Sequence, residues 1–160
     1  MPRIEPAHIE GDALQSSLLA RVMGRCPDVL RAFGRLDNTL RFRGTLPMSL
    51  LESVRRVTAG EVGCEYCASL GTPRTEYTDQ REAVATAFAQ LVATDPAGIS
   101  DGQFNVLREE FTDEEIVELV AYICFISIGG QMFGAVMGLE AADADEADAY
   151  QAALASHAHS

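Results

Sequence analysis

The sequence predicts a single-domain, all-α helical bundle, and three observations lead to this fold class. Residues that begin and end helices recur along the whole chain. Runs in which apolar and polar residues alternate, which mark β-strands, are missing. The chain has 160 residues, of which 48% are hydrophobic, so one domain is the default and roughly two thirds of the extended surface is buried on folding. We assign residues 1–140 to this domain and residues 141–160 to an acidic, alanine-rich C-terminal tail.

Three helices are expected before residue 61. The first covers Ala13–Gly24, the second covers Asp28–Leu40 after Pro27, which suits a first helical turn, and the third begins at Pro47 and ends at Gly60. Each helix places apolar residues on one face at helical spacing. These residues are Leu14, Leu18 and Val22, then Val29, Phe33, Leu36 and Leu40, then Leu50, Val54 and Val57.

The next two helices are placed by their ends. A short helix, Cys64–Leu70, ends before Gly71, a residue typical of the position after a helix. Thr78 is expected to cap a fifth helix. The inward-facing residues of this fifth helix are Val84, Phe88 and Leu91.

Two capping boxes, in which side chains at both ends of the first turn satisfy its free amides, place the remaining helices. Ser100 with Gln103 begins a short helix that ends near Glu110. Thr112 with Glu115 begins a long helix that runs from residue 113 to about residue 138. The segment from residue 141 is either helical or frayed.

The charge of the chain excludes several functions. The formal net charge is −12, whereas nucleic acids and anionic membrane surfaces require clustered cations. All 12 basic residues are arginines, which excludes chemistry through a lysine Schiff base. Residues 1–56 hold nine arginines and six acids, and residues 57–160 hold three arginines and eighteen acids. This asymmetry is either a solvated acidic face or an aid to docking between protomers. The first residues contain no apolar core of signal-peptide length, so we expect a cytoplasmic protein.

An uncharged stretch covers residues 119–139 and is long enough to cross a bilayer. Its flanks are acidic and no arginine lies nearby, whereas a membrane span is expected to show basic residues on its cytoplasmic side. We therefore expect a helix buried in a soluble core or an interface. Gly130, Gly134 and Gly138 repeat every four residues along it and allow close helix contact, either within the chain or in a homo-oligomer.

Two of the four cysteines, Cys64 and Cys67, form a Cys-x-x-Cys motif. On a helix this spacing brings the sulfurs close enough for a disulfide, and the free amides of a first turn favour a thiolate. A thiolate with a second sulfur in reach is what a dithiol redox site requires. The motif has three other interpretations: a zinc site, which lacks further ligands, a thioredoxin motif, which needs a βαβ unit, and small apolar core residues.

The other candidate residues are given structural interpretations. Cys26 and Cys124 are expected to be buried apolar residues. His157 and His159 could bind a metal, but a solvated tail is the simpler interpretation, and no metal or cofactor is expected.

Glu52 lies twelve residues before Cys64, and its spacing to Arg55 and Arg56 predicts a surface ion pair. The same glutamate also belongs to a longer pattern. The run Leu50-Leu-Glu52-Ser-Val-Arg-Arg…Gly63-Cys64-Glu-Tyr-Cys67 resembles the signature of the carboxymuconolactone decarboxylase-like superfamily. The closer resemblance is to its alkylhydroperoxidase D-like branch, whose motif is Glu, eleven residues, Cys-x-x-Cys, three residues, His. Segments 78–85, 99–104 and 111–119 also resemble the helices of that branch, so the resemblance covers about residues 26–139.

The resemblance implies an all-helical fold that assembles as trimers or hexamers and reduces peroxides. It implies that Cys67 is the thiolate that attacks a hydroperoxide, that Cys64 is the resolving thiol, and that Glu52 draws the proton from Cys67 as a general base. An external thiol reductant, a lipoyl- or thioredoxin-like protein, would be the second partner. The histidine of the family motif falls at Gly71 in this chain. The residues considered as its substitutes are Tyr66, Ser69 and Tyr77.

The sequence therefore predicts a homo-oligomeric oxidoreductase that reduces hydroperoxides through a dithiol–disulfide cycle. Two alternatives stay open. One is a lyase like the decarboxylase that names the superfamily, although such chemistry has no use for neighbouring thiols. The other is a non-catalytic oligomeric protein on the same scaffold, which the loss of the histidine makes plausible.

Overall fold

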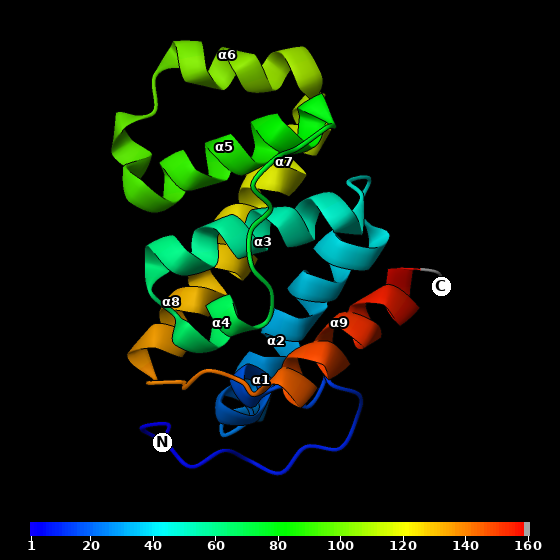
Figure 1. The fold of residues 1–160 in the computed structure, drawn as a ribbon, viewed down its shortest axis with the longest axis vertical. Coiled ribbons are helices and arrows are strands. Elements are labelled where there is room, and N and C mark those ends of the chain that lie inside the picture. Colours follow the sequence, from blue (N-terminus) through cyan, green and yellow to red (C-terminus); the bar gives the residue numbers. More distant parts are fainter. Residues whose placement is uncertain (159–160) are drawn as a thin grey trace.

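A computed structural model of the protein describes residues 1–158 and confirms the all-α fold, with no β-strand among those residues (Figure 1). Figure 1 shows α3 crossing the middle of the molecule, with α5 and α6 on one side and α2 and α9 on the other. In chain order the elements are α1 (Leu18–Met23), α2 (Pro27–Asn38), the π-helical segment η1 (Thr39–Arg43), α3 (Met48–Val62), α4 (Glu65–Ser69), α5 (Gln80–Thr94), the 3₁₀ turn η2 (Pro96–Gly98), α6 (Asp101–Glu110), α7 (Asp113–Ala121), the π-helical segment η3 (Tyr122–Ile128), α8 (Gly129–Val136) and α9 (Ala144–Ala158).

Helix α3 is the centre of the packing. It contacts α5 along one side and η3, α4 and α8 along others. Its predicted apolar face is confirmed, because Leu50, Val54 and Val57 are all buried. This face belongs to the larger of two apolar cores, which also includes side chains of α5, α6, α7 and η3. The smaller core contains residues of α1, α4 and α9 together with both cysteines of the motif. The dithiol therefore lies inside the packed part of the bundle.

Helix α2 lies at the edge of the bundle and departs from the prediction. Of its expected apolar face, Leu40 is buried and Phe33 packs partly against the larger core. Val29 and Leu36 are 51% and 37% exposed. The helix is amphipathic in sequence, but the single chain offers too little partner surface to cover its whole apolar side.

Two helix ends in the first half of the chain differ from the prediction. The first helix begins at Leu18 rather than at Ala13, because the Ser17 side chain accepts a backbone N–H of the first turn and caps it there. The third helix continues past Gly60. It ends at Gly63, whose φ of 79° places it in the left-handed region that favours glycine.

The caps in the second half are mostly as predicted. Both capping boxes are confirmed, with reciprocal hydrogen bonds at the starts of α6 and α7. The cap of α5 is Asp79 rather than Thr78, since the Asp79 carboxylate accepts the backbone N–H of Arg81 at 2.8 Å. A carboxylate at this position also interacts favourably with the helix dipole.

Most of the uncharged stretch lies in one continuous helix, which runs from residue 113 to residue 136 through α7, η3 and α8. The hydrogen-bond pattern of this helix changes to π-helical in η3. By length and composition alone this helix could cross a membrane, since an 18-residue part of it has a mean hydropathy of 1.8, and 44% of that part is buried in the fold. It packs against α2, α3 and α5 through η3, as expected for a helix in a core. Three of its side chains are largely exposed, Phe125 at 61%, Met132 at 56% and Val136 at 63%.

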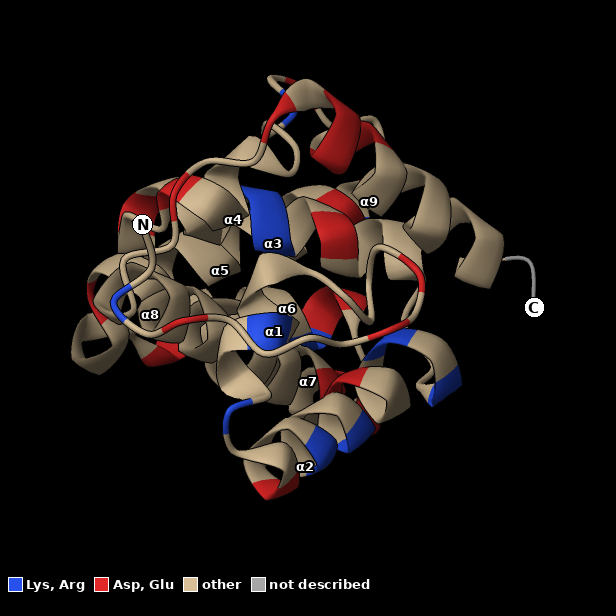
Figure 2. Cartoon of the chain, turned by 90° about the horizontal axis from the view of Figure 1, so that it is seen from below, with Lys and Arg blue, Asp and Glu red and all other residues tan. Residues whose placement is uncertain are grey.

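Helix α9 folds back over the bundle, where Tyr150 and Leu154 are buried in the smaller core. Figure 2 shows acidic residues gathered at the beginning of α9 and arginines along α2. Cys26 is exposed, contrary to expectation, because it precedes Pro27 at the outer start of α2, and Cys124 is half-buried.

Candidate functional site

The Cys-x-x-Cys motif forms a disulfide in the structure, between Cys64 and Cys67, with Cα atoms 5.2 Å apart. Cys64 is the N-cap of α4 rather than a residue of its first turn, and its sulfur accepts the backbone N–H of Cys67 at 3.2 Å. The two sulfurs therefore differ in their surroundings. Cys64 is 1% exposed and stabilised by an amide, whereas Cys67 is 7% exposed and lines a cavity.

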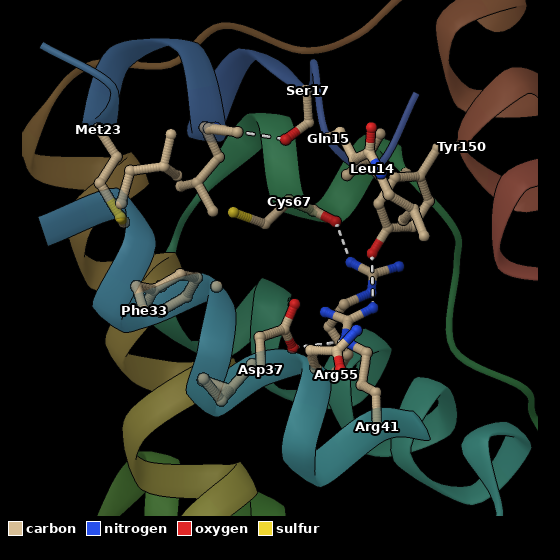
Figure 3. A pocket seen from close by; sticks show the side chains of 18 of the residues that line it. Leu14, Gln15, Ser17, Met23, Phe33, Asp37, Arg41, Arg55, Cys67 and Tyr150 are labelled. Carbon is tan, nitrogen blue, oxygen red and sulfur yellow. Dashed lines mark hydrogen bonds and ion pairs between the residues drawn. The ribbon is translucent and has the colours of Figure 1, made fainter. Parts of the chain in front are cut away.

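The cavity has a volume of about 410 Å³ and lies between α2, the loop before α1, α4, η3 and α9. Figure 3 shows the Cys67 sulfur pointing into it, toward Met23 and Phe33. One end is apolar, and the other end holds Asp37, Arg41 and Arg55 (Figure 3). A cavity of this size accepts an organic molecule the size of one or two rings. Its apolar lining consists mainly of Leu14, Leu19, Met23, Leu30, Phe33 and Ile126.

Glu52 forms the predicted ion pairs, but they are buried rather than at the surface. Both of its oxygens accept hydrogen bonds from Arg55, at 2.7 and 2.8 Å, and Oε1 also accepts one from Arg56 at 3.1 Å. Burial favours the neutral acid, but the hydrogen bonds and charge of Arg55 outweigh it and hold the pKa of Glu52 at about 2. Within residues 1–158 no hydrogen bond joins this carboxylate to either sulfur.

Arg55 connects this carboxylate to the dithiol. While two of its nitrogens bind Glu52, its Nη1 donates to the backbone carbonyl of Cys67 at 2.7 Å. Its guanidinium also lies over the ring of Tyr150, with the Cζ atom 5.4 Å from the ring centre. Burial disfavours its charge, yet the neighbouring Tyr150 and Glu52 raise the pKa of Arg55 above its ordinary value. Arg55 therefore stays charged and fixes the backbone of α4 at Cys67.

The position of the missing histidine is filled by other side chains. A Cβ atom at Gly71 would lie 2.8 Å from Arg56 Nε and 3.1 Å from Gln151 Nε2. Gln151, on α9, also donates to the Leu70 carbonyl at 2.5 Å and to Glu52 at 3.2 Å. The space that a residue-71 side chain would need is thus taken by a guanidinium and an amide.

Three residues were considered as substitutes for the motif histidine: Tyr66, Ser69 and Tyr77. Two of them have hydrogen-bond partners within the fold, and two of them lie outside the cavity. The Tyr66 hydroxyl donates to Glu146 and accepts the backbone N–H of Leu18, and burial raises its pKa. The Ser69 hydroxyl donates to the Tyr66 carbonyl. The Tyr77 hydroxyl is buried with no hydrogen-bond partner among the described residues. Of the three, only Tyr66 lines the cavity.

The glycines of the long helix pack within the chain. A Cβ atom at Gly134 would lie 2.7 Å from the Cys64 sulfur and 3.3 Å from the Cys67 sulfur, and one at Gly130 would lie 3.3 Å from the Phe33 ring. Gly138 faces Arg3. Gly130 and Gly134 thus pack within the chain, and α8 lies directly on the disulfide; an oligomer interface along this helix stays a prediction.

Sequence reasoning missed the polar end of the cavity. Asp37 pairs with Arg41 at 2.7 Å, and Arg41 donates to the Tyr150 hydroxyl at 3.1 Å. The spacing of Asp37 and Arg41, four residues apart on a helix, is a usable signal. The sequence contains no comparable signal for Tyr150, because its contacts with α3 and η1 join segments about a hundred residues apart.

Metal binding has no support in the described part of the chain. Residues 1–158 contain no cluster of three metal-ligating side chains. His157 pairs with Asp12 at 3.0 Å and stacks on Phe42, while His159 lies outside the described residues.

Comparison with solved structures finds the same fold in the debrominase Bmp8. A cysteine-to-alanine variant of Bmp8 in complex with 2,3,4-tribromopyrrole matches with a TM-score of 0.69 and 20% sequence identity, over 89% of this chain and 87% of that chain. The apo structure of Bmp8 matches with a TM-score of 0.66 and 23% identity, over 87% and 82% of the two chains. These likenesses establish the shared fold. No protein-family model and no curated protein matches the sequence.

Proposed function

We propose that the protein is a thiol-dependent oxidoreductase of the carboxymuconolactone decarboxylase-like superfamily that reduces a small organic hydroperoxide. The observation that carries this proposal is the placement of the two sulfurs: Cys67 faces a cavity of about 410 Å³, and Cys64 lies behind it within bonding distance. An accessible sulfur with a partner in reach can accept oxidation from a substrate and pass it into an internal disulfide.

The reaction balances with the two thiols alone as reductant. The Cys67 thiolate attacks the terminal oxygen of the hydroperoxide, the O–O bond breaks, and Cys67 becomes a sulfenic acid while the alkoxide takes a proton. The Cys64 thiolate then attacks the Cys67 sulfur and displaces water, which forms the disulfide. The two thiol protons end on the alcohol and on the water.

The amide that donates to the Cys64 sulfur suits both halves of the cycle. It stabilises a thiolate on Cys64 as the resolving nucleophile, and again as the leaving group when an external thiol attacks Cys67. The reductant in this proposal is a lipoyl- or thioredoxin-like protein. It must reach Cys67 through the cavity, because Cys64 is 1% exposed.

The role of Glu52 follows from its partners. A carboxylate with a pKa of about 2 is ionised but is a weak proton acceptor. In this proposal Glu52 acts mainly by holding Arg55 against the Cys67 carbonyl. General-base catalysis by Glu52 stays a prediction, which slower oxidation of a Glu52→Gln variant under conditions where the variant remains folded would support.

Reductive dehalogenation is the second candidate, and the apolar lining of the cavity favours it. The cavity is larger than a peroxide group requires and resembles a site for a ring compound. The structure of Bmp8 with 2,3,4-tribromopyrrole shows that this fold binds a brominated ring. With such a substrate Cys67 would take the bromine, the ring carbon would take a proton, and Cys64 would release bromide while the disulfide forms. A lyase activity has no comparable use for the paired sulfurs.

The proposal also includes the oligomeric state and the cellular compartment of the protein. A homotrimer or homohexamer in the cytoplasm is part of this proposal, and the exposed apolar side chains of α2 and α8 are consistent with self-association. The arginines on α2 and the acids on α9 (Figure 2) are charges of opposite sign that protomers can pair.

Thiol counting tests the proposed chemistry. The reduced protein, treated with cumene hydroperoxide, should lose two of its four thiols, and peptide mapping should find them joined as Cys64–Cys67. Cys67→Ser should abolish the loss, Cys64→Ser should still lose one thiol, and Cys26→Ser serves as the control that loses two. Bromide release from 2,3,4-tribromopyrrole tests the second candidate. If neither reagent oxidises the pair faster than it oxidises Cys26, the site is wrong.

A further inference from the structure

The cavity beside Cys67 is apolar over most of its wall and charged at one end. Asp37, Arg41 and Arg55 form that end, opposite the Cys67 sulfur (Figure 3). Such a shape orients a ligand, because its apolar part and its polar group have separate places. The free polar atoms at this end therefore determine which head group a substrate carries.

The guanidinium groups at this end are already neutralised. Arg55 binds both oxygens of Glu52, and Arg41 Nε lies 2.7 Å from Asp37 Oδ1. The third nearby cation, Arg56, lies outside the cavity wall and donates to Glu52, Thr72 and Gln151. Arg41 and Arg55 thus each pair with a carboxylate, although Glu52 is shared with Arg56, and this pairing weakens the attraction for an anionic ligand.

Among the described residues, Asp37 and Gln131 each present an unpaired hydrogen-bond acceptor in the cavity wall. Asp37 Oδ2 accepts no hydrogen bond within residues 1–158, and Figure 3 shows this oxygen pointing into the cavity. The Asp37 side chain is 27% exposed, so a ligand can reach it. The second acceptor is Gln131 Oε1, which is buried without a partner while the amide nitrogen of the same residue binds the Arg55 carbonyl at 2.8 Å. Gln131 is 3% exposed and also lines the cavity. An unpaired buried acceptor is costly and is relieved by a donor.

We infer that the substrate is a small, mostly apolar organic molecule with an uncharged O–H or N–H group, and that Asp37 accepts the hydrogen bond from this group. This inference rests on the proposed function for the chemistry at Cys67, but the recognition by Asp37 does not depend on which bond is reduced. A pyrrole offers its N–H to Asp37 while a carbon–bromine bond across the ring faces Cys67. A hydroperoxide needs a second O–H or N–H group for Asp37, because its terminal oxygen must lie at the Cys67 sulfur at the other end of the cavity. A carboxylate offers no donor and would face the Asp37 charge.

Binding to the oxidised protein tests the inference apart from catalysis. We choose 4-ethylphenol and 4-ethyltoluene, in which a methyl group replaces the hydroxyl at nearly equal size, and 4-ethylbenzoate as the anion. Dissociation constants are measured by NMR titration of the disulfide form. A hydrogen bond to a charged group corresponds to about a ten- to hundredfold change in affinity, so the phenol-over-toluene preference should fall by that factor in Asp37→Ala.

The variants separate charge from folding. Asp37→Asn keeps a neutral acceptor and should lose only part of the preference, because charge-assisted hydrogen bonds are about twice as strong. It also keeps the test available if Asp37→Ala fails to fold. Both variants free Arg41 and should bind 4-ethylbenzoate at least tenfold more tightly than the wild type does. Asp28→Ala is the matched control, since Asp28 lies on the same helix, pairs with Arg31, and is outside this cavity.

The binding results for the Asp37 variants can be told apart from the thiol-oxidation results that test the proposed function. An unchanged phenol preference in both Asp37 variants overturns the inference, and so does the absence of 4-ethylphenol binding to the wild type. If Asp37 controls the preference but hydroperoxide and tribromopyrrole leave the thiols intact, the recognition stands and the proposed reaction fails. If the thiols oxidise while Asp37 has no effect on binding, the reaction stands and the inference fails.

Discussion

Replacing Gly134 with alanine is expected to disturb the disulfide from the helix that covers it. The new Cβ atom would lie 2.7 Å from the Cys64 sulfur and 3.3 Å from the Cys67 sulfur. Neither sulfur is the free end of a flexible side chain, because the two are bonded to each other. Either α8 or the start of α4 must therefore move.

The magnitude follows from a comparison with Gly60, which also lies in a helix but whose Cβ would meet nothing within 4 Å. Both substitutions gain helix propensity, about 1 kcal/mol each, so the difference between them isolates the clash. Overpacking of this kind costs about 1–3 kcal/mol. For a chain of 160 residues one kcal/mol corresponds to about 2–4 °C in Tm, so the Gly134→Ala variant should melt about 2–12 °C below the Gly60→Ala variant.

The assay is thermal unfolding of both variants in oxidised and reduced form. Reduction frees the sulfurs to turn away, so the difference in Tm should shrink when dithiothreitol is present. Equal Tm values for the two oxidised variants would refute the reasoning, since they would mean that α8 does not lie on the disulfide.

Three further outcomes are expected. Glu52 has a pKa of about 2 in the fold against 4.5 for the free group, so it contributes about 3 kcal/mol of stability above pH 4.5. That contribution should disappear as the pH falls toward 2 in chemical denaturation, and a Glu52→Gln variant should lack this part of the profile. Gly71→His should leave the rate of thiol oxidation by cumene hydroperoxide no higher than in the wild type, because Arg56 and Gln151 occupy the space; a faster rate would contradict this. Light scattering should show an assembly larger than the 17.2 kDa chain that survives dilution, whereas a monomer at every concentration would exclude the proposed oligomer.

The fold could be predicted from the sequence wherever local signals and burial agree. Helix α3 illustrates this, since Leu50, Val54 and Val57 have helical spacing and are all buried. The same spacing failed for Val29 and Leu36 on α2, which are exposed. Amphipathicity shows that a helix has an apolar side but gives no information on whether a single chain supplies enough surface to cover it.

The site could be predicted only in its local part. The pairing of Cys64 with Cys67 follows from a spacing of three residues, which a helix start brings together. The ion pairing of Glu52 with Arg55 was also predictable, but its burial was not, because burial depends on α9 packing over α3. Asp37 and Tyr150 were missed because the cavity that unites them is a tertiary feature.

Helix α9 lies beside Gly71, the position at which the motif that the sequence resembles has a histidine. In sequence it belongs to an acidic, alanine-rich tail, yet it supplies two polar side chains to the centre of the site. Gln151 donates to Glu52 and to the Leu70 carbonyl, next to the position where the histidine of the motif would stand, and Tyr150 accepts a hydrogen bond from Arg41. A histidine at position 71 would crowd Gln151, since its Cβ atom alone would lie 3.1 Å from Gln151 Nε2, so the glutamine would have to shift. The space beside Gly71 and the docking of α9 are therefore linked, because Gln151 lies next to Gly71 and belongs to the network of Glu52 and Arg55 that holds the backbone of Cys67.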